Sequence, residues 1–300
     1  MAPIRQATAP DLALLAFTML LWAGAFVGIK VAVPAVGPVG VAASRACIGL
    51  LVLAPLWAFR GGDLPGSTRQ WMLLIAMAEL NVAVPFTLIS YAELTVSAGV
   101  ASLVMGTGPL FAMVGAHYFN EGDPMSLRRA LGVAMGFGGI AVVVGPNAFG
   151  EVGATPLIAL SALVAASMCY VASGLLVRLI DLPPLSLAVL ALAISGATLL
   201  PIAAAIGVDK EAIDRNVVMT LLFLGIFPTG LAYVLRFHLI ARIGYATFAL
   251  GVNMIPIFGV LLGVVLLGEE LTPPVLIALC LIVGGLLIAR HTRRGRARPT

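Results

Sequence analysis

The sequence predicts an all-α integral membrane protein with ten transmembrane helices, arranged as two inverted five-helix repeats around a central cavity. Three observations favour this fold class. Of the 300 residues, 61% are hydrophobic and 10% are charged, with a mean hydropathy of +1.11, whereas soluble domains carry about 25% charged residues. The apolar residues form runs long enough to cross a bilayer. The two halves of the chain also match each other weakly but in order.

The predicted spans come from the lengths of the apolar runs. Crossing a hydrocarbon core of ~30 Å takes about 20 residues of helix. Charges and clusters of Pro, Gly and Asp divide the chain into ten such runs, each apolar on nearly all sides, as expected for helices in lipid. The apolar runs continue along the whole chain, so the first is interpreted as a retained span and not as a cleaved signal peptide. The predicted spans are residues 12–33, 38–59, 70–91, 94–119, 129–147, 155–177, 184–206, 217–236, 243–267 and 272–290.

The distribution of Lys and Arg predicts the orientation. The side that holds both termini carries thirteen arginines, whereas the other side carries Lys30, Lys210 and Arg215. Loops rich in Lys and Arg stay in the cytoplasm. We therefore predict a multi-pass protein of the bacterial inner membrane with both termini cytoplasmic. The thirteen are Arg5, Arg60, Arg69, Arg128, Arg129, Arg178, Arg236, Arg242, Arg290, Arg293, Arg294, Arg296 and Arg298.

A self-comparison at an offset of 146–148 residues indicates an internal repeat. Each half holds five predicted spans, an odd number, so the second half must enter the membrane from the opposite side, as in many secondary transporters. We predict a first repeat at residues 1–150, a second, inverted repeat at 151–290 and a basic cytoplasmic tail at 291–300. The matched positions include Trp22 with Tyr170, Lys30 with Arg178, Pro55 with Pro201, Pro109 with Pro256, and Gly138-Gly139 with Gly284-Gly285.

Several motifs along the chain carry a resemblance to a known family. They are Trp22-Ala-Gly-Ala-Phe-Val-Gly-Ile-Lys30, Arg45 in the second span, Ala-Ser-Leu before Gly-Pro109, and Gly268-Glu269-Glu270-Leu271-Thr272. The chain resembles the EamA-type members of the drug/metabolite transporter superfamily over nearly its whole length. The resemblance implies that the first four helices of each half enclose a cavity, that the fifth packs at the periphery, and that amino acids or related metabolites are exported. The first half departs from the pattern, because it reads Glu121-Gly-Asp-Pro where the second reads Gly-Glu-Glu-Leu-Thr.

Two charged side chains are predicted deep inside the spans, Arg45 in the second and Glu79 in the third. A charge at a helix centre costs about 2.5–3.5 kcal/mol on insertion scales, so both should face the bundle interior, where an ion pair across adjacent helices is expected. That pair is either structural or a substrate or proton site. Phe86 shares the face of Glu79 by α-helical spacing and is expected beside the cavity.

Prolines predict interruptions inside the spans, because a proline leaves the carbonyl four residues earlier without its donor. Pro109 and Pro256 occupy matched positions in the fourth and ninth spans and are candidate hinges, or sites where freed carbonyl groups meet a substrate ammonium group. Packing kinks are the alternative. Asn253 precedes the second of these prolines and is expected in the cavity. Pro228 leaves the Leu224 carbonyl free in the same way.

Three aromatic residues, Trp22, Tyr170 and Tyr233, lie toward mid-depth, where anchoring at the membrane interface does not explain them. They are predicted as cavity walls that stack on a substrate side chain, with core packing as the alternative. Gly132-x-x-x-Gly136 and Gly284-Gly285 form the small-residue pattern of close helix contact and are interpreted as packing.

The remaining motifs exclude several function classes. The three cysteines have no C-x-x-C spacing and the three histidines are scattered, so we expect neither a metal site nor a cofactor. The chain has no P-loop, and its basic tail does not indicate nucleic acid. We expect a secondary active or facilitative transporter that exports small metabolites, foremost amino acids with aromatic or other apolar side chains, and not an enzyme. A membrane-embedded enzyme acting on a lipid is the alternative. The sequence does not distinguish proton-coupled transport from uniport, or a monomer from a homodimer.

Overall fold

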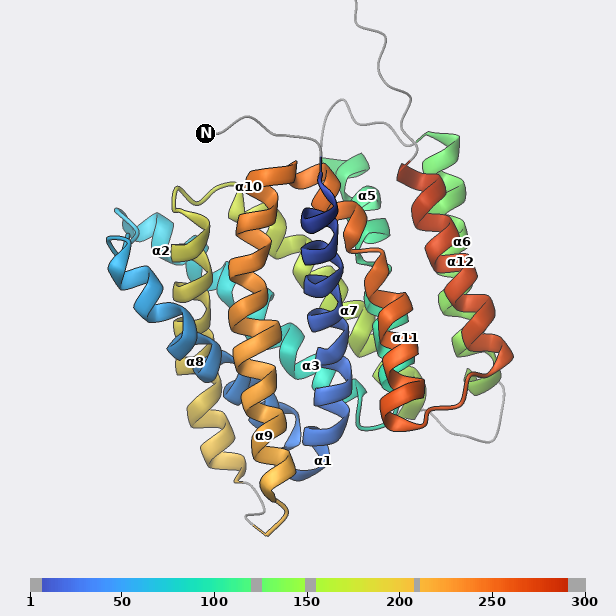
Figure 1. Ribbon diagram of the computed structural model, residues 1–300, viewed down its shortest axis with the longest axis horizontal. Coiled ribbons are helices and arrows are strands. Elements are labelled where there is room, and N and C mark those ends of the chain that lie inside the picture. The colour runs from blue at the N-terminus through green and yellow to red at the C-terminus, as the bar shows by residue number, and fades with distance from the viewer. Residues whose placement is uncertain (1–6, 120–125, 149–154, 208–210, 291–300) are drawn as a thin grey trace, which may run out of the picture.

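A computed structural model describes residues 7–119, 126–148, 155–207 and 211–290, and all regular secondary structure in these ranges is helical. The helices stand side by side in one bundle (Figure 1). The predicted basic tail at 291–300 lies outside the described residues. In chain order the elements are α1 (Ala9–Phe59), α2 (Thr68–Ala78), η1 (Glu79–Ala83), α3 (Val84–Ala92), α4 (Ala98–Met105), α5 (Gly108–Phe119), α6 (Leu127–Ala148), α7 (Thr155–Val177), α8 (Pro184–Ile206), α9 (Arg215–Leu224), η2 (Gly225–Leu231), α10 (Ala232–Gly251), α11 (Met254–Leu267) and α12 (Pro273–Arg290).

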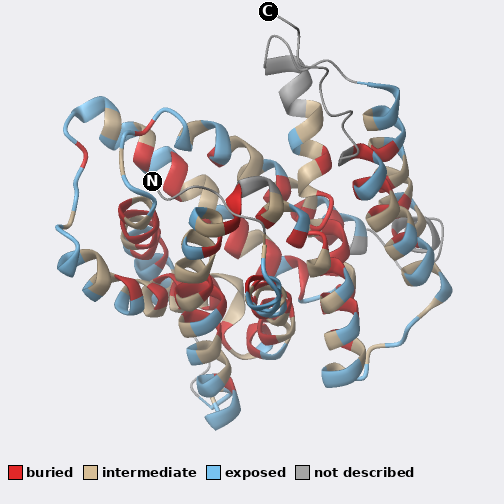
Figure 2. Ribbon diagram, turned by 45° about the horizontal axis from the view of Figure 1, so that its top comes forward, coloured by how far each residue is buried: buried red, intermediate tan, exposed pale blue. Residues whose placement is uncertain are grey.

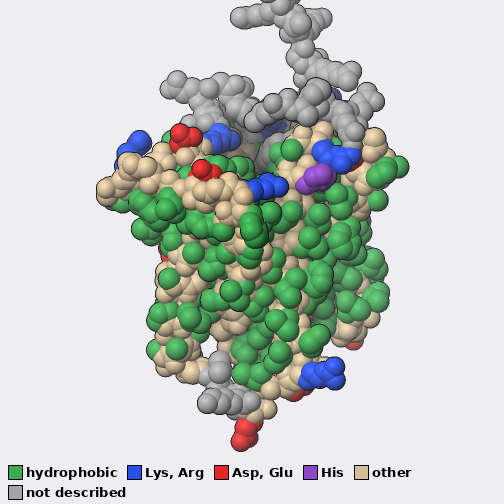
Figure 3. Space-filling view, turned by 60° about the vertical axis from the view of Figure 1, so that its left-hand side comes forward, with side chains coloured by type: hydrophobic (Ala, Val, Ile, Leu, Met, Phe, Trp, Pro, Cys, Tyr) green, Lys and Arg blue, Asp and Glu red, His purple; other side chains and the backbone are tan. Residues whose placement is uncertain are grey.

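The outer surface of the bundle is that of an integral membrane protein. Within the described residues, six helical stretches are long and apolar enough to cross a bilayer. Hydrophobic side chains cover the middle of the face in Figure 3, and charged side chains gather mainly at its two ends. The buried residues lie on the inner sides of the helices, whereas the outer sides are exposed (Figure 2). The six stretches are Ala9–Phe59, Thr68–Ala92, Leu157–Val177, Pro184–Ile206, Arg215–Gly244 and Thr247–Leu267.

Each predicted span coincides with a helix or with an interrupted helix. The first two spans form α1, which bends at Gly37, where φ is 71°. The prediction for the eighth span is wrong at its end. Instead of stopping at Arg236, the helix continues through α10 to a break at Gly244. Arg236 and Arg242 therefore both lie inside a helix and not in a loop. Arg242 is in the last turn before the break, whereas Arg236 lies about two turns deeper, so twelve arginines instead of thirteen remain at that end of the spans.

The interruptions fall in predicted spans that occupy equivalent places in the two halves of the chain. The third and eighth spans each contain a π-helical stretch, η1 and η2. The fourth span breaks between α4 and α5, just before Pro109, and the ninth breaks between α10 and α11, just before Pro256. These two breaks also touch, because a Cβ atom built on Gly106 would overlap the ring of Pro256. Only glycine permits this approach of the two backbones.

Helices α6 and α12 lie side by side at one edge of the bundle (Figure 1). Gly132 on α6 and Gly285 on α12 face each other across this contact, and a Cβ atom built on either would overlap the backbone of the other helix. Small residues allow such close approach, so dispersion contacts hold the pair together in lipid. The geometry agrees with the packing interpretation of these glycines.

The bundle has two ends, and each is named after a residue that lies there. The Lys30 end contains the bend of α1 and the connections 93–97 and 268–272, and is drawn at the bottom of Figure 1. The Arg60 end is the opposite one. At the Lys30 end, apolar residues of α1, α3, α4, α7 and α9 form one buried cluster that includes Val33, Ala98 and Leu160.

Candidate functional site

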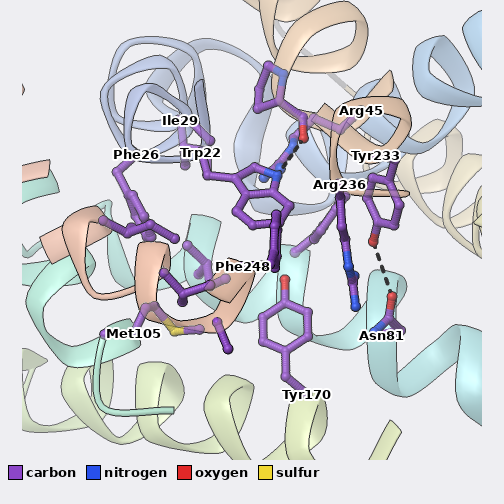
Figure 4. A pocket seen from close by; sticks show the side chains of 18 residues that line it. Trp22, Phe26, Ile29, Arg45, Asn81, Met105, Tyr170, Tyr233, Arg236 and Phe248 are labelled. Atoms are coloured by element: carbon purple, nitrogen blue, oxygen red, sulfur yellow. Dashed lines mark hydrogen bonds between the residues drawn. The ribbon is translucent and has the colours of Figure 1, made fainter. Parts of the chain in front are cut away.

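A cavity of about 340 Å³ lies inside the bundle, within the size range of small-molecule sites. Its walls come from both halves of the chain, and its lining mixes large apolar side chains with a few polar ones (Figure 4). The apolar lining includes Trp22, Phe26, Ile29, Phe86, Met105 and Phe248, and the polar lining consists of Arg45, Asn81, Tyr170, Tyr233 and Arg236.

Arg45 is buried at the cavity wall, with 6% of its surface exposed. Its guanidinium carbon lies 3.9 Å from the centre of the Phe86 ring, a cation–π contact, and its Nε donates to Thr229 Oγ1 at 3.4 Å. Thr229 Oγ1 in turn donates to the Leu224 carbonyl at 2.8 Å. That carbonyl is the one that Pro228 was expected to free, so the threonine supplies the missing donor and Arg45 is held against η2.

Trp22 fixes the same π-helical stretch from α1. Its Nε1 donates to the Pro228 carbonyl at 3.1 Å, and its ring meets Phe248 edge to face with 5.9 Å between ring centres. Indole is well suited to this position, because its apolar ring can line a cavity while its single donor is satisfied by backbone. The hydrogen bond thus orients one aromatic wall of the cavity.

A chain of hydrogen bonds beside the cavity joins the predicted third span to the sixth and the eighth. Tyr233 Oη donates to Asn81 Oδ1 at 3.3 Å, and Asn81 Nδ2 donates to Ser173 Oγ at 3.0 Å. Ser173 Oγ donates to the Tyr170 carbonyl at 2.9 Å. The Tyr170 hydroxyl points into the cavity (Figure 4). Polar groups from three helical segments are therefore collected on one side of the cavity.

Comparison with known proteins places the chain in a family. A single family model, described as the EamA-like transporter family, matches residues 11–145 and again residues 157–290. The chain belongs to the EamA-like transporter family. The two matches together cover most of the chain, so it is a transporter of the drug/metabolite transporter superfamily and a membrane protein.

Relatives of this EamA-like transporter carry similar names. It is 24% identical to a probable terminal-alkyne amino-acid exporter of Streptantibioticus cattleyicolor, over 95% of this chain and 94% of the relative. It is also 24% identical to an uncharacterized transporter of Archaeoglobus fulgidus, over 93% and 98% of the two chains. A protein of known crystal structure shares the fold with a TM-score of 0.67 at 19% identity, over 95% of this chain and 98% of the other.

The EamA-like transporter does not form the expected ion pair between Arg45 and Glu79. Thr198 on α8 donates to Glu79 Oε1 at 2.8 Å on the exposed side of the bundle, and Glu79 does not line the cavity. The reason is η1, because a π-helical turn inserts a residue and rotates the following faces by about 100°. α-Helical spacing therefore fails to relate Glu79 to Phe86, and Asn81 takes the place in the cavity that was predicted for the acid.

The remaining predicted site residues lie next to the cavity but not in its lining. Asn253 is buried, and the described residues offer its Oδ1 no hydrogen bond, while the preceding Val252 lines the cavity. Pro109 lies in the first turn of α5 and Pro256 in the first turn of α11, each directly after a helix break. Five of the seven residues predicted for the cavity do line it: Trp22, Arg45, Phe86, Tyr170 and Tyr233.

Sequence reasoning missed a buried carboxyl group, that of Glu93. This side chain is 0% exposed, and neither of its oxygens has a hydrogen-bond partner within the part of the chain that the structure describes. Lys30 does not hydrogen-bond to this carboxyl group. Its Nζ donates instead to the backbone carbonyls of Glu93 and Val96, at 2.7 and 2.8 Å. Burial raises the pKa of Glu93 well above its ordinary value, the positive charges of Lys30 and Arg45 oppose this shift, and Glu269 adds to it. Its place directly after α3 made it look like a loop residue.

Glu269, from the Gly-Glu-Glu-Leu-Thr motif, contacts a helix far away in sequence. Its Oε1 and Oε2 accept hydrogen bonds from the backbone nitrogens of Ala98 and Gly99 at 2.6 and 2.9 Å. These are the first residues of α4, where backbone donors are unpaired and a negative charge is favoured. The motif thus joins the connection before α12 to the start of α4 at the Lys30 end. Among the described residues, no group of three or more His, Cys, Asp or Glu could hold a metal ion.

Proposed function

We propose that this transporter carries small amphipathic metabolites, foremost amino acids with aromatic or other apolar side chains, out of the cell. The observation that carries the proposal is the cavity, which combines aromatic walls with a small set of polar groups from both halves of the chain. The name of the Streptantibioticus relative, a probable amino-acid exporter, supports the same substrate class.

We also propose that transport proceeds by alternating access between two inverted five-helix repeats, residues 1–150 and 151–290, with ten spans and both termini in the cytoplasm. Three findings support this arrangement. The same family model matches the chain twice, the π-helical stretches lie in the third and eighth spans, and the breaks at Gly106 and Asn253 are 147 residues apart in the fourth and ninth. Repeats of this kind place a substrate between halves that rock against each other.

Counterflow in reconstituted vesicles tests the proposal. Vesicles loaded with an unlabelled amino acid should take up the same labelled amino acid in exchange, because an alternating-access carrier returns loaded from either side. Phenylalanine, leucine and lysine form a suitable panel, and the first two should exchange fastest. Met105→Trp should abolish exchange, because it fills the cavity, whereas Leu51→Trp on the exposed side of α1 should retain it.

Two outcomes would contradict the proposal. One is exchange no faster than in protein-free vesicles for the whole panel. The other is equal exchange by the Met105→Trp and Leu51→Trp proteins, which would take transport away from the cavity. The same vesicles distinguish uniport from proton coupling, since accumulation driven by a pH gradient requires coupling. Glu93→Gln is the variant to include there, because Glu93 and not Glu79 is the fully buried acid.

A further inference from the structure

Arg236 is a charged group that lines the cavity and has no partner among the described residues. It projects from α10 among the labelled lining residues, between Phe248 on one side and Asn81 with Tyr233 on the other (Figure 4). Its Nε is buried and has no hydrogen-bond partner, and the described residues offer its guanidinium neither a hydrogen bond nor an ion pair. The residue as a whole is partly exposed, but an unpaired positive charge in a cavity partly shielded from water is stabilised when an anion binds beside it.

The other arginine of the cavity is already engaged. Arg45 donates to Thr229 and lies over the Phe86 ring, so its guanidinium is held against the wall. No Asp or Glu occurs among the described residues that line the cavity. The two arginines therefore give the cavity a positive field that the lining does not neutralise. This field favours an anionic ligand and opposes a purely cationic one.

The chemistry of the rest of the lining defines what the anion must be attached to. Trp22, Phe26 and Phe248 present aromatic surface to the same space that Arg236 enters. The guanidinium of an arginine pairs with a carboxylate through two parallel hydrogen bonds, a geometry that the ammonium group of a lysine does not provide. Aromatic surface accepts an apolar group of matching size. The site thus suits a molecule with a carboxylate at one end and an apolar group at the other.

We infer that Arg236 is the residue that binds the carboxylate of the transported molecule, so that the carrier selects amphipathic carboxylates over the corresponding amines and amides. This inference rests on the proposed function, because it assigns a binding role within the transport cavity. It gives α10, the helix that follows the π-helical stretch η2, a direct contact with the substrate.

Ligand binding can be measured without transport, because Trp22 lies in the cavity and reports on it. In the Trp57→Phe, Trp71→Phe protein, Trp22 is the only tryptophan. Fluorescence of the purified protein is titrated with 3-phenylpropionate, phenylalanine, phenylalaninamide and phenethylamine, which contain no indole. The two acids should change the fluorescence saturably, and the amide and the amine should bind at least about tenfold more weakly, because they lack a charge-assisted pair of hydrogen bonds.

The same titration on Arg236→Gln should weaken binding of both acids by at least about tenfold and remove the preference for acid over amine. Arg242→Gln is the matched control, since Arg242 lies on the same helix but pairs with Asp11 at 3.1 Å outside the cavity lining. It should bind as the parent does. Arg236→Lys, which keeps the charge but loses the two-pronged geometry, should fall between them. Thermal unfolding of each variant checks that it is folded.

The inference is overturned if phenethylamine binds as tightly as 3-phenylpropionate, if neither acid binds, or if folded Arg236→Gln binds the acids as the parent does. These outcomes are separate from failure of the proposed function. A protein that binds the acids through Arg236 but shows no counterflow would contradict transport of these compounds and leave the binding assignment standing. A protein that exchanges amines as fast as acids would contradict the binding assignment and leave the proposed transport standing.

Discussion

Glu269→Ala is expected to destabilise the folded protein by about 2–4 kcal/mol, because two hydrogen bonds that the Glu269 carboxylate accepts from the start of α4 are lost together. The Ala98 and Gly99 backbone nitrogens, now bonded at 2.6 and 2.9 Å, would be left without a partner in the interior of the Lys30 end. Thermal unfolding in detergent should show the loss as a lower Tm. Glu269→Gln should lose less, since an amide oxygen still accepts one of the two bonds.

The matched control for this experiment is the next residue. Glu270 is an exposed acid of the same motif, so Glu270→Ala changes the net charge equally without touching α4. Its effect should stay within about 0.5 kcal/mol, as for surface substitutions in general. Equal Tm values for the Glu269→Ala and Glu270→Ala proteins would mean that the contact with α4 contributes nothing.

Gly106→Ala is expected to abolish transport and to lower stability by about 1–3 kcal/mol or more, because the added methyl group would overlap the ring of Pro256. A proline ring is fixed to its backbone and cannot rotate away, so the two broken helices would have to separate. Counterflow and thermal unfolding of the same preparation measure the two effects. This substitution removes the contact between the fourth and ninth spans and leaves both prolines in place.

Gly108→Ala provides the comparison. Gly108 lies two residues further along the same interrupted span, and nothing lies within 4 Å of a Cβ built on it. Both substitutions reduce backbone freedom alike, so any difference between them measures the contact with Pro256. Similar transport rates in the two variants would show that the approach of the two breaks is not needed for the transport cycle.

Much of the fold was predictable from the sequence, because it depends on the apolar composition of long segments of the chain. Apolar runs of about 20 residues have few alternatives to a membrane helix, and prolines at 109 and 256 marked the two breaks. The end of the eighth span was not predictable in the same way. Arg236 has the residue type of a cytoplasmic loop, but α10 continues past it to Gly244, since the arginine faces a cavity and not lipid.

The candidate site was harder to predict, because local helix geometry decides which side chains meet. Arg45, Trp22, Tyr170 and Tyr233 were found because polar or aromatic groups at mid-depth are conspicuous in apolar spans. In the π-helical stretch η1, Glu79 faces away from the bundle centre and Asn81 faces toward it. A prediction from α-helical spacing assumes 3.6 residues per turn and therefore misses this rotation. The signal that could have identified Asn81 is its position four residues before Pro85, a proline inside the predicted third span.

The most direct test of alternating access uses one cysteine in the cavity. In a protein lacking Cys47, Cys169 and Cys280, Met105→Cys is treated with a membrane-impermeant thiol reagent from either side of sealed vesicles. Alternating access predicts reaction from both sides, with the two rates changing in opposite directions when a transported amino acid is supplied on one side only. Reaction from one side alone under all conditions would contradict it.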